Sequence, residues 1–386
     1  MTTYASLDVA FVRGAGAWLY DEHGHAYLDA LAGIAVCGLG HAHPQLATAL
    51  ADQATQLLHT SNIYRIPLQE QLAAELICAS GMERAFFCNS GAEANEAAIK
   101  LARLYGHRQE ISKPKIVVME NAFHGRTLAA LSATGSVKAQ TGFTPLVQGF
   151  VRVPYGDIDA IKQVAAEHSE IVAVLLEPIQ GEGGIRVPPP GFLRAVREFC
   201  DEKNWLLMLD EVQTGMARTG LWFACQHEQV QPDVMLLAKA LGNGIPIGAC
   251  LAARLATDLF QPGSHGSTFG GNPFASRAAL TVIDIIRQQR LAEHVVNLGE
   301  RMRQGFHEQF DDCENITSIR GKGLMIGIEL DRPCGELVQH ALAEKLLINV
   351  TANNVIRLLP PLILNDAEAD QIVTVLGGCI KNFLKN

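Results

Sequence analysis

Residues 205–211 read WLLMLDE, an apolar run that ends in an acidic pair, and residues 234–239 read VMLLAK, an apolar run that ends in a lysine. Two similar runs, KIVVM at 115–119 and IVAVLL at 171–176, precede them. Unbroken apolar runs of this length are typical of strands that are buried on both faces of a parallel sheet. Residues 192–201 have the amphipathic pattern of a crossover helix. The centre of the chain therefore predicts an α/β fold, with a mostly parallel sheet flanked by helices.

The two ends of the chain carry a different pattern. Residues 8–29 predict a small antiparallel piece, and residues 275–310 predict long helices. A chain of 386 residues is long enough for two domains. The expected division is an N-terminal segment (1–45) that packs with the smaller domain, a large cofactor-binding domain (46–280) and a small α+β C-terminal domain (281–386).

Composition and charge exclude several classes of protein. Lys and Arg number 31 against 40 Asp and Glu, which gives a net charge of −9 without a basic run, so we expect no nucleic-acid binding. The polar N-terminus does not resemble a signal peptide, and no apolar stretch is long enough to span a bilayer. Nine scattered cysteines without a CxxC pair argue against a disulfide framework or a cysteine zinc site. We expect a cytoplasmic protein with no membrane association and no metal.

Three polar features follow predicted strands, and each has an ordinary interpretation. Ser90 and Gly91 open an Ala/Glu-rich helix whose free N–H groups could bind a phosphate, although capped helices without a phosphate are far commoner. Asp210 and Glu211 end an apolar strand where ligands bind in α/β sheets, or they simply cap the strand. Lys239 precedes a glycine-rich loop and could bond an aldehyde, although most lysines are solvated at the surface.

Together these features match the requirements of pyridoxal 5'-phosphate. The helix would hold the phosphate, and Lys239 would bond the aldehyde. Asp210, which lies 29 positions before Lys239, would keep the pyridine nitrogen protonated. Arg126 and Arg357 could then bind substrate carboxylates, although each alone would be interpreted as a surface arginine.

Eight motifs extend this match over nearly the whole chain, from about residue 8 to about residue 365. With them the chain resembles the class-III, fold-type-I pyridoxal-phosphate aminotransferases, and within that family the acetylornithine aminotransferases. The motifs are NSGAEANEAAIKLAR (89–103), AFHGRTLAALSATG (122–135), EPIQGEGGI (177–185), LDEVQTGMARTG (209–220), LLAKALGNGIPIGA (236–249), GSTFGGNP (266–273), RGKGLMIGIEL (320–330) and IRLLPPL (356–362).

The resemblance implies roles for individual residues. Lys239 would bond the cofactor and carry a proton during catalysis, and Asp210 would pair with the ring nitrogen. The other cofactor-binding residues would be Ser90, Gly91, Ala92, Phe123, Glu211, Val212, Gln213 and, reaching the phosphate of the neighbouring subunit, Thr268. Arg126, Ser267 and Arg357 would bind substrate, and Glu182 would neutralise Arg357 in one half-reaction. The role of Thr268 implies a homodimer with shared active sites.

The resemblance also implies an activity in arginine biosynthesis. The δ-amino group of N2-acetyl-L-ornithine would pass to 2-oxoglutarate, giving N-acetyl-L-glutamate 5-semialdehyde and L-glutamate. Ornithine aminotransferases carry a tyrosine near position 34, whereas the apolar Ile34 of this chain suits an N-acylated substrate better. The chain departs from the usual acetylornithine pattern at Cys37 and Met216.

Other activities stay open at this point. The amine donor could be succinylornithine, succinyl-diaminopimelate, ornithine or 4-aminobutyrate. An aminomutase on the same fold would use the same cofactor but would need no 2-oxoglutarate. A protein that keeps the fold without turnover is a third alternative, but retention of both Lys239 and Asp210 argues against it.

Overall fold

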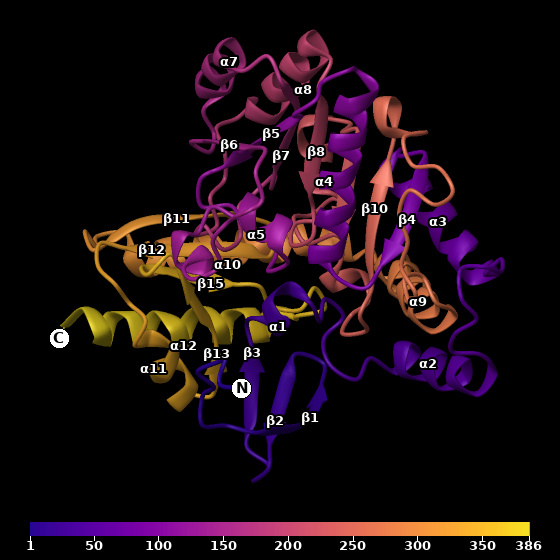
Figure 1. Ribbon diagram of the computed structural model, residues 1–386. Coiled ribbons are helices and arrows are strands. Elements are labelled where there is room, and N and C mark those ends of the chain that lie inside the picture. Colours follow the sequence, from indigo (N-terminus) through magenta and orange to yellow (C-terminus); the bar gives the residue numbers. More distant parts are fainter. Residues whose placement is uncertain (386) are drawn as a thin grey trace.

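The computed structural model describes residues 1–385, and a seven-stranded sheet lies at its centre (Figure 1). The strand order is β4-β10-β9-β8-β7-β5-β6. Only β10 runs antiparallel to its neighbours, and the strands from β9 to β6 are parallel to one another. These strands are β4 (Arg84–Cys88), β5 (Lys115–Met119), β6 (Phe150–Val153), β7 (Ile171–Leu176), β8 (Leu206–Asp210), β9 (Val234–Leu237) and β10 (Gly248–Ala252). The predicted α/β fold with a mostly parallel sheet is confirmed.

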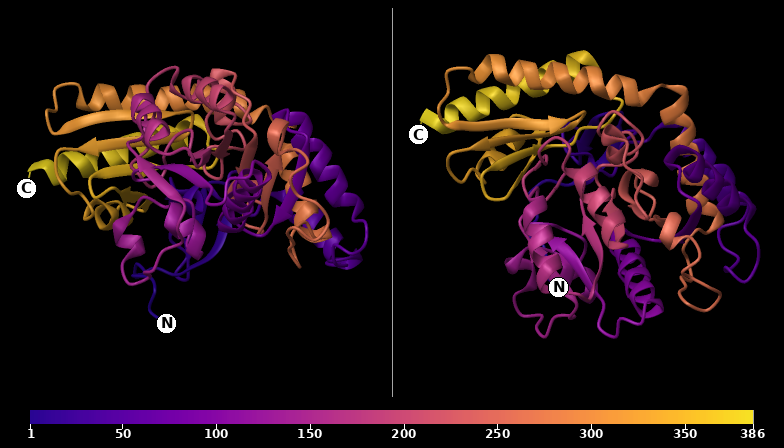
Figure 2. Two further views of the ribbon diagram at one scale, coloured as in Figure 1. Left: turned by 45° about the horizontal axis from the view of Figure 1, so that its top comes forward. Right: turned by 90° about the horizontal axis from the view of Figure 1, so that it is seen from above.

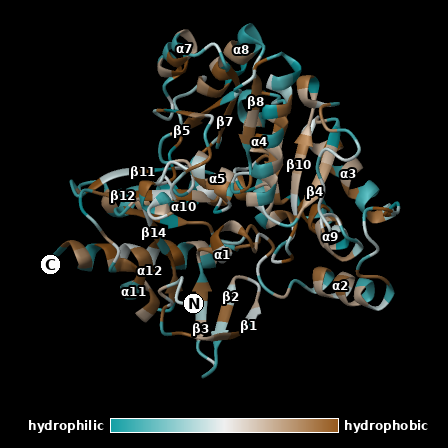
Figure 3. Ribbon diagram, in the orientation of Figure 1, coloured by the Kyte–Doolittle hydropathy of each residue, from teal (hydrophilic) through white to brown (hydrophobic). Residues whose placement is uncertain are grey.

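Both faces of this sheet are covered, as its apolar runs require (Figure 3). Alternate residues of a strand point to opposite faces, so Ile116 and Val118 pack with α4 while Val117 and Met119 pack with the opposite layer, which includes α8. The helices are α2 (Pro44–Gln56), α3 (Pro67–Ser80), α4 (Gly91–Arg108), α5 (Leu128–Ala133), α6 (Val137–Gln140), α7 (Ile158–Glu167), α8 (Phe192–Lys203) and α9 (Pro273–Gln288).

The C-terminal part of the chain builds a second, antiparallel sheet with the order β11-β12-β15-β14. Its strands are β11 (Ile316–Lys322), β12 (Met325–Leu330), β14 (Asn349–Thr351) and β15 (Val355–Leu358). Figure 2 shows α10 (Leu291–Phe310) and α12 (Asp366–Lys385) side by side along this sheet, and the two helices are in contact. Between β12 and β14 lie α11 (Leu337–Ala343) and β13 (Leu346–Leu347).

The N-terminal strands join a third sheet with the order β1-β2-β3-β13. These are β1 (Phe11–Ala15), β2 (Trp18–Asp21) and β3 (Ala26–Asp29), and the short α1 (Ala32–Ala35) follows them. Because β3 pairs in parallel with β13, the two ends of the chain share this sheet. Within residues 1–385, every helix is too short or too polar to cross a membrane.

The elements predicted from the sequence agree best with the structure in the buried strands. The runs 115–119 and 171–176 coincide with β5 and β7, and the run 205–209 is shifted by one residue in β8. The helical pattern at 275–310 is interrupted at Arg290, whose positive φ of 52° separates α9 from α10. A left-handed residue ends a helix, because the next turn cannot continue in the same direction.

A buried carboxylate aligns the two strands that lead into the functional region. Asp233, which precedes β9, is fully buried and accepts hydrogen bonds from the Leu207 N–H of β8 at 2.8 Å and from Arg197 Nη1 of α8 at 2.6 Å. Arg254 Nε lies 3.4 Å from the other carboxylate oxygen. The carboxylate therefore joins β8, β9 and α8 at the end of the sheet opposite Asp210 and Lys239.

We predict that Arg197→Met destabilises the fold. The substitution keeps much of the packing volume but removes the principal cation of a buried pair, so we expect unfolding free energy to fall by about 3 kcal/mol. Chemical denaturation measures this loss. Arg194→Met on the exposed face of α8 is the matched control and should change stability by less than about 0.5 kcal/mol. Equal stability of the two variants would contradict the role given to Asp233.

Candidate active site

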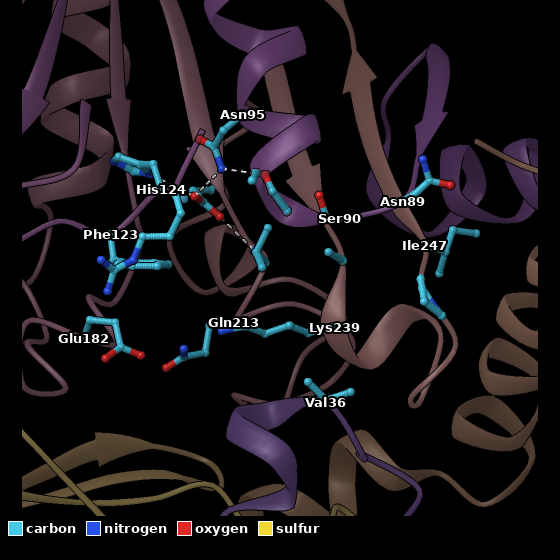
Figure 4. A pocket seen from close by; sticks show the side chains of 18 of the residues that line it. Val36, Asn89, Ser90, Asn95, Phe123, His124, Glu182, Gln213, Lys239 and Ile247 are labelled. Carbon is cyan, nitrogen blue, oxygen red and sulfur yellow. Dashed lines mark hydrogen bonds and ion pairs between the residues drawn. The ribbon is translucent and has the colours of Figure 1, made fainter. Parts of the chain in front are cut away.

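Five chain segments bring four polar side chains and one aromatic side chain to one edge of the central sheet, because parallel strands end at the same edge. Ser90 follows β4, Phe123 follows β5, Glu177 follows β7, Asp210 ends β8, and Lys239 follows β9. They surround a cavity of about 400 Å³ (Figure 4). The predicted residues that line it are Ser90, Gly91, Ala92, Phe123, Arg126, Glu182, Asp210, Val212, Gln213 and Lys239.

The carboxylate of Asp210 lies at the inner end of the cavity and is held by three donors. Asn95 Nδ2 donates to Oδ2 at 2.9 Å, His124 Nδ1 donates to Oδ2 at 2.8 Å, and the Val212 N–H donates to Oδ1 at 3.1 Å. The side chain is only 4 % exposed. Because an ionised carboxylate is a pure acceptor, this set of donors holds a fixed negative charge in a buried position.

Two of these three donors, Asn95 and His124, were not predicted from the sequence. Asn95 lies one helical turn after Gly91, so its side chain is on the face of α4 that turns toward the cavity. His124 lies between Phe123 and Arg126 in a motif that was quoted only for its neighbours. The spacing of Asn95 from the helix start could have indicated that its side chain faces the cavity. For His124, only its place in the motif 122–135 could have indicated a role.

Lys239 occupies a strained and partly desolvated position. Its φ of 45° lies in the left-handed region, which is uncommon for a residue with a side chain and is often found at functional sites. Burial, and next the positive charge of Arg357, lower the pKa of its amine from 10.5 to about 8, while Glu182, Asp210 and Glu177 oppose the shift. The uncharged, nucleophilic form of this amine is therefore far more populated near neutral pH than it is in an ordinary lysine.

The N-terminus of α4 is arranged to receive an anion. Ser90 Oγ accepts the Glu93 N–H at 3.2 Å, and the Glu93 carboxylate accepts the Asn89 N–H, which together cap the helix. A side chain on Gly91 would lie 2.9 Å from Val212, so glycine lets the helix start approach the loop after Asp210. In the first turn of a helix, free N–H groups such as those of Gly91 and Ala92 bind phosphate readily.

Glu177, which sequence analysis did not select, connects two walls of the cavity. Its carboxylate accepts the Phe123 N–H and the Gly181 N–H, each at 3.1 Å. Burial raises its pKa to about 7, against the effect of His124. A Cβ on Gly181 would lie 2.1 Å from Gln213 Oε1, so only glycine fits beside that amide. Within residues 1–385, this buried Oε1 has no hydrogen-bond partner.

A buried ion pair adjoins the cavity. Arg357 of β15 is 1 % exposed, and its Nη1 lies 2.6 Å from Glu182 Oε1. Its Nε donates to Asn349 Oδ1 at 3.0 Å. Glu182 keeps 36 % of its side-chain surface exposed, so the carboxylate has room to leave the arginine. Arg126, a second cation at the cavity wall, is exposed and lies above the ring of Phe123.

Four predicted residues do not line this cavity, and one of them, Arg357, adjoins it through its ion pair with Glu182. The Glu211 carboxylate faces away and accepts the Ala224 and Cys225 N–H groups at 3.0 and 2.8 Å, so in this structure it anchors a neighbouring turn. Ser267 Oγ accepts the amide of Asn89 at 3.3 Å and the Gly270 N–H at 2.9 Å. Thr268 is exposed on the same loop.

The residues around the cavity fit pyridoxal 5'-phosphate. The helix start offers N–H groups for the phosphate, and the Asp210 carboxylate matches a protonated pyridine nitrogen. The unpartnered Gln213 Oε1 is an acceptor toward the ring hydroxyl. Lys239 is a partly neutral amine in the same cavity, and a volume of about 400 Å³ is sufficient for a small cofactor together with part of a substrate.

Comparisons with known proteins also indicate a pyridoxal-phosphate aminotransferase. Residues 2–380 match the family Aminotransferase class-III. The chain is 57 % identical over 386 residues to an acetylornithine aminotransferase of Nitrosomonas europaea, covering 100 % of this chain and 98 % of the relative. An acetylornithine aminotransferase of Methanothermobacter thermautotrophicus is 46 % identical over 386 residues, covering 99 % of this chain and 96 % of the relative.

Solved structures agree on the fold. The ornithine aminotransferase of Toxoplasma gondii superposes with a TM-score of 0.96 at 33 % identity, covering 100 % of this chain and 93 % of the other. The acetylornithine aminotransferase of Elizabethkingia anophelis superposes with a TM-score of 0.88 at 36 % identity, covering 99 % and 96 %. Since the two names differ in substrate, shape alone does not distinguish acetylated from free ornithine.

The lowered pKa of Lys239 gives a testable pH dependence. When cofactor is added to the cofactor-free protein, only the neutral amine can bond its aldehyde. We therefore expect the rate of appearance of the visible absorbance band to rise with pH and level off above about pH 8, not near 10.5. Arg357→Ala should move the midpoint to higher pH because a nearby positive charge is removed, and Arg194→Ala should leave it unchanged. A wild-type rate that still rises steeply above pH 9 would contradict this account.

Proposed function

The chain belongs to the class-III aminotransferases, and we propose that it transfers the δ-amino group of N2-acetyl-L-ornithine to 2-oxoglutarate. The products would be N-acetyl-L-glutamate 5-semialdehyde and L-glutamate, in a step of arginine biosynthesis. Full-length identity of 46–57 % to acetylornithine aminotransferases supports this substrate. The observation that carries the proposal is the Arg357–Glu182 pair beside the cavity.

The enzyme is a pyridoxal-phosphate aminotransferase, and the cofactor supplies an aldehyde for amine exchange and a ring that withdraws electrons from the substrate carbon. We propose that Lys239 holds the cofactor and moves the proton at the substrate carbon, a task for which a pKa of about 8 is suitable. Asp210 would face the ring nitrogen, with Asn95 and His124 fixing its carboxylate. Phe123 and Val212 would contact the ring.

The remaining cofactor contacts are proposed from the geometry of the cavity wall. The N–H groups of Gly91 and Ala92, with Ser90 beside them, would hold the phosphate at the start of α4. The amide of Gln213 would bind the ring oxygen. Glu211, whose carboxylate is engaged by a neighbouring turn, would support the Asp210 loop without touching the cofactor.

The ion pair explains how one pocket can accept two substrates of different charge. Glutamate and 2-oxoglutarate carry a second carboxylate close to the reacting carbon, and Arg357 can bind it bidentately once Glu182 has moved aside. N2-acetylornithine has no carboxylate at that end, so Glu182 must neutralise the buried guanidinium instead. Arg126, which lines the cavity above the ring of Phe123, would bind the carboxylate of the acetylated substrate.

Preference for the acylated substrate is supported by Ile34. This half-buried side chain packs with an apolar cluster near the cavity, and it offers no hydroxyl to the free α-amino group of ornithine. With an apolar residue at this position, the charged α-amino group of an unacylated substrate would lack a hydrogen-bond partner, which would weaken its binding. The same argument leaves succinylornithine and succinyl-diaminopimelate as acceptable amine donors.

A homodimer with shared sites is part of the proposal. Ile63 is 85 % exposed and Phe269 is 60 % exposed. The Asn62 amide donates to the main-chain oxygen of Ser267 at 3.0 Å, which joins these two apolar segments into one surface beside Thr268. Large exposed apolar side chains next to a polar loop are typical of an interface. In such a dimer Thr268 would reach the phosphate in the partner's site, and Ser267 would contact substrate there.

We further propose a cytoplasmic location and the division into a large and a small domain with an N-terminal segment. The boundary expected at 280/281 falls inside the continuous helix α9, so the junction of α9 and α10 near Gln289 is the better division. Residue 386, the end of the expected small domain, lies outside the described residues.

The decisive experiment is a single half-reaction. We expect N2-acetyl-L-ornithine, added without 2-oxoglutarate, to bleach the visible absorbance band of the purified protein rapidly, and 2-oxoglutarate to restore it. Ornithine and 4-aminobutyrate should react at least about tenfold more slowly, because loss of a fitted polar or apolar contact costs roughly 1–3 kcal/mol. Lys239→Ala is the control and should not respond. A band that is indifferent to all three of these amines would contradict the proposal and favour an aminomutase.

A further inference from the structure

Both members of the Arg357–Glu182 pair are hydrogen-bonded to the same short strand. Asn349 Oδ1 accepts from Arg357 Nε at 3.0 Å. Thr351 Oγ1 donates to the main-chain oxygen of Glu182 at 2.5 Å. Asn349 and Thr351 are the first and last residues of β14, and neither was selected from the sequence.

The geometry of β14 makes this double contact possible. Residues i and i+2 of a strand share a face, so Asn349 and Thr351 point the same way. Asn349 lies directly opposite Arg357 in the antiparallel register of β14 and β15, and Thr351 lies opposite Val355. The same face is closely packed against the loop that carries Glu182, since a Cβ on Gly184 would lie 3.1 Å from Val355 and 3.3 Å from Ala352.

We propose that β14 positions the carboxylate gate: Asn349 sets the plane of the Arg357 guanidinium, and Thr351 anchors the peptide from which the Glu182 side chain swings. This inference rests on the proposed function, in which Arg357 binds acidic substrates and Glu182 replaces them. Asn349 and Thr351 are thereby positioning residues that determine how well the site discriminates between acidic and acylated substrates.

The contact of Asn349 matters because a guanidinium is planar. A hydrogen bond at Nε fixes the rotation of that plane and leaves the Nη atoms for a carboxylate. Without this bond the guanidinium is held only by Glu182, the partner that must leave when a dicarboxylate enters. Loss of Asn349 should therefore weaken dicarboxylate binding more than it weakens binding of the acylated substrate.

The contact of Thr351 acts on the other half of the gate. The loop around Glu182 is held on both sides, since the Gly181 N–H is bound by Glu177 and the oxygens of Gly184 and Ile185 accept from Arg320 at 2.6 and 2.9 Å. With its own oxygen held by Thr351, Glu182 has a fixed main chain, and its carboxylate moves by side-chain rotation. Loss of this anchor should loosen the pairing of Glu182 with Arg357, which penalises the acylated substrate.

The two contacts thus predict opposite changes in selectivity. For Asn349→Ala we expect the dissociation constant of glutarate, an unreactive five-carbon dicarboxylate, to rise about tenfold, since a hydrogen bond to a charged group is lost. The apparent affinity for N2-acetyl-L-ornithine in the half-reaction should fall less than about threefold. For Thr351→Val we expect the reverse: acetylornithine binding weakens about fivefold, and glutarate binding is unchanged or tighter.

Titration calorimetry of the cofactor-loaded dimer with glutarate gives the equilibrium binding constant, and rapid-mixing absorbance gives the acetylornithine half-reaction. Thr351→Ser keeps the hydroxyl and should restore the wild-type ratio of the two affinities. Thr317→Val is the matched control, because Thr317 Oγ1 also donates to a main-chain oxygen of the same sheet, that of Glu329 at 3.1 Å, away from the gate.

The outcomes are distinguishable. Opposite shifts of the two affinities, rescue by serine and an unchanged ratio in the Thr317 variant would support the inference. Parallel losses for both ligands in the Asn349 and Thr351 variants, accompanied by a lower melting temperature, would mean a purely structural role and would overturn it. A wild-type protein that neither binds glutarate nor reacts with acetylornithine would instead overturn the proposed function on which the inference rests.

Discussion

The active site depends on one buried charge, the carboxylate of Asp210. It is held by donors from three places that are distant in sequence: Asn95 in α4, His124 in the loop after β5, and the main chain of Val212. A buried carboxylate is costly unless such donors are already in place, so the folded sheet must bring all of them to one edge before any ligand binds. At the other end of the sheet, Asp233 joins β8, β9 and α8. These contacts align β8 with β9 and thereby fix the positions of Asp210 and Lys239 at the cavity.

The second constraint is that the ion pair beside the cavity joins parts of the chain with different architecture, since Glu182 follows β7 and Arg357 lies in β15. The central sheet and its helices supply the start of α4 with its free N–H groups, the Asp210 carboxylate and the amine of Lys239. The C-terminal antiparallel sheet supplies Arg357 and, through β14, the contacts that orient it. In the proposed function, the groups that act at the reacting carbon thus come from the central sheet, and the arginine that selects the carboxylate comes from the C-terminal sheet. With these proposed roles, a change in the C-terminal sheet would alter selectivity while the groups that move protons stay in place.

Much of the fold could be predicted from local pattern, and the reason is burial. Short unbroken apolar runs such as 171–176 are typical of strands that are buried on both faces, and this run coincides with β7. Strands β10 and β14 were not predicted, because β10 contains small residues in a glycine-rich context and β14 has only three residues. Arg290 interrupted a helical pattern that looked continuous, since a single left-handed residue leaves no mark on hydrophobic periodicity.

The site residues could be predicted where the residue type and its position at a strand end already indicate a chemical role. Lys239 and Asp210 stand out at strand ends, but Asn95, His124 and Glu177 act through contacts that only the assembled sheet creates. Glu211 shows the opposite case, because its position in sequence suggested a ligand contact while its carboxylate faces a neighbouring turn.

The most direct test of this account is the protonation state of the cofactor's ring nitrogen, measured by ¹⁵N NMR with labelled pyridoxal 5'-phosphate in the wild-type protein and in Asp210→Asn. We expect the chemical shift of a protonated pyridinium throughout the neutral pH range in the wild type, and that of an unprotonated nitrogen in the variant. An unprotonated nitrogen in the wild type, or the same shift in both proteins, would contradict the central role of the Asp210 carboxylate.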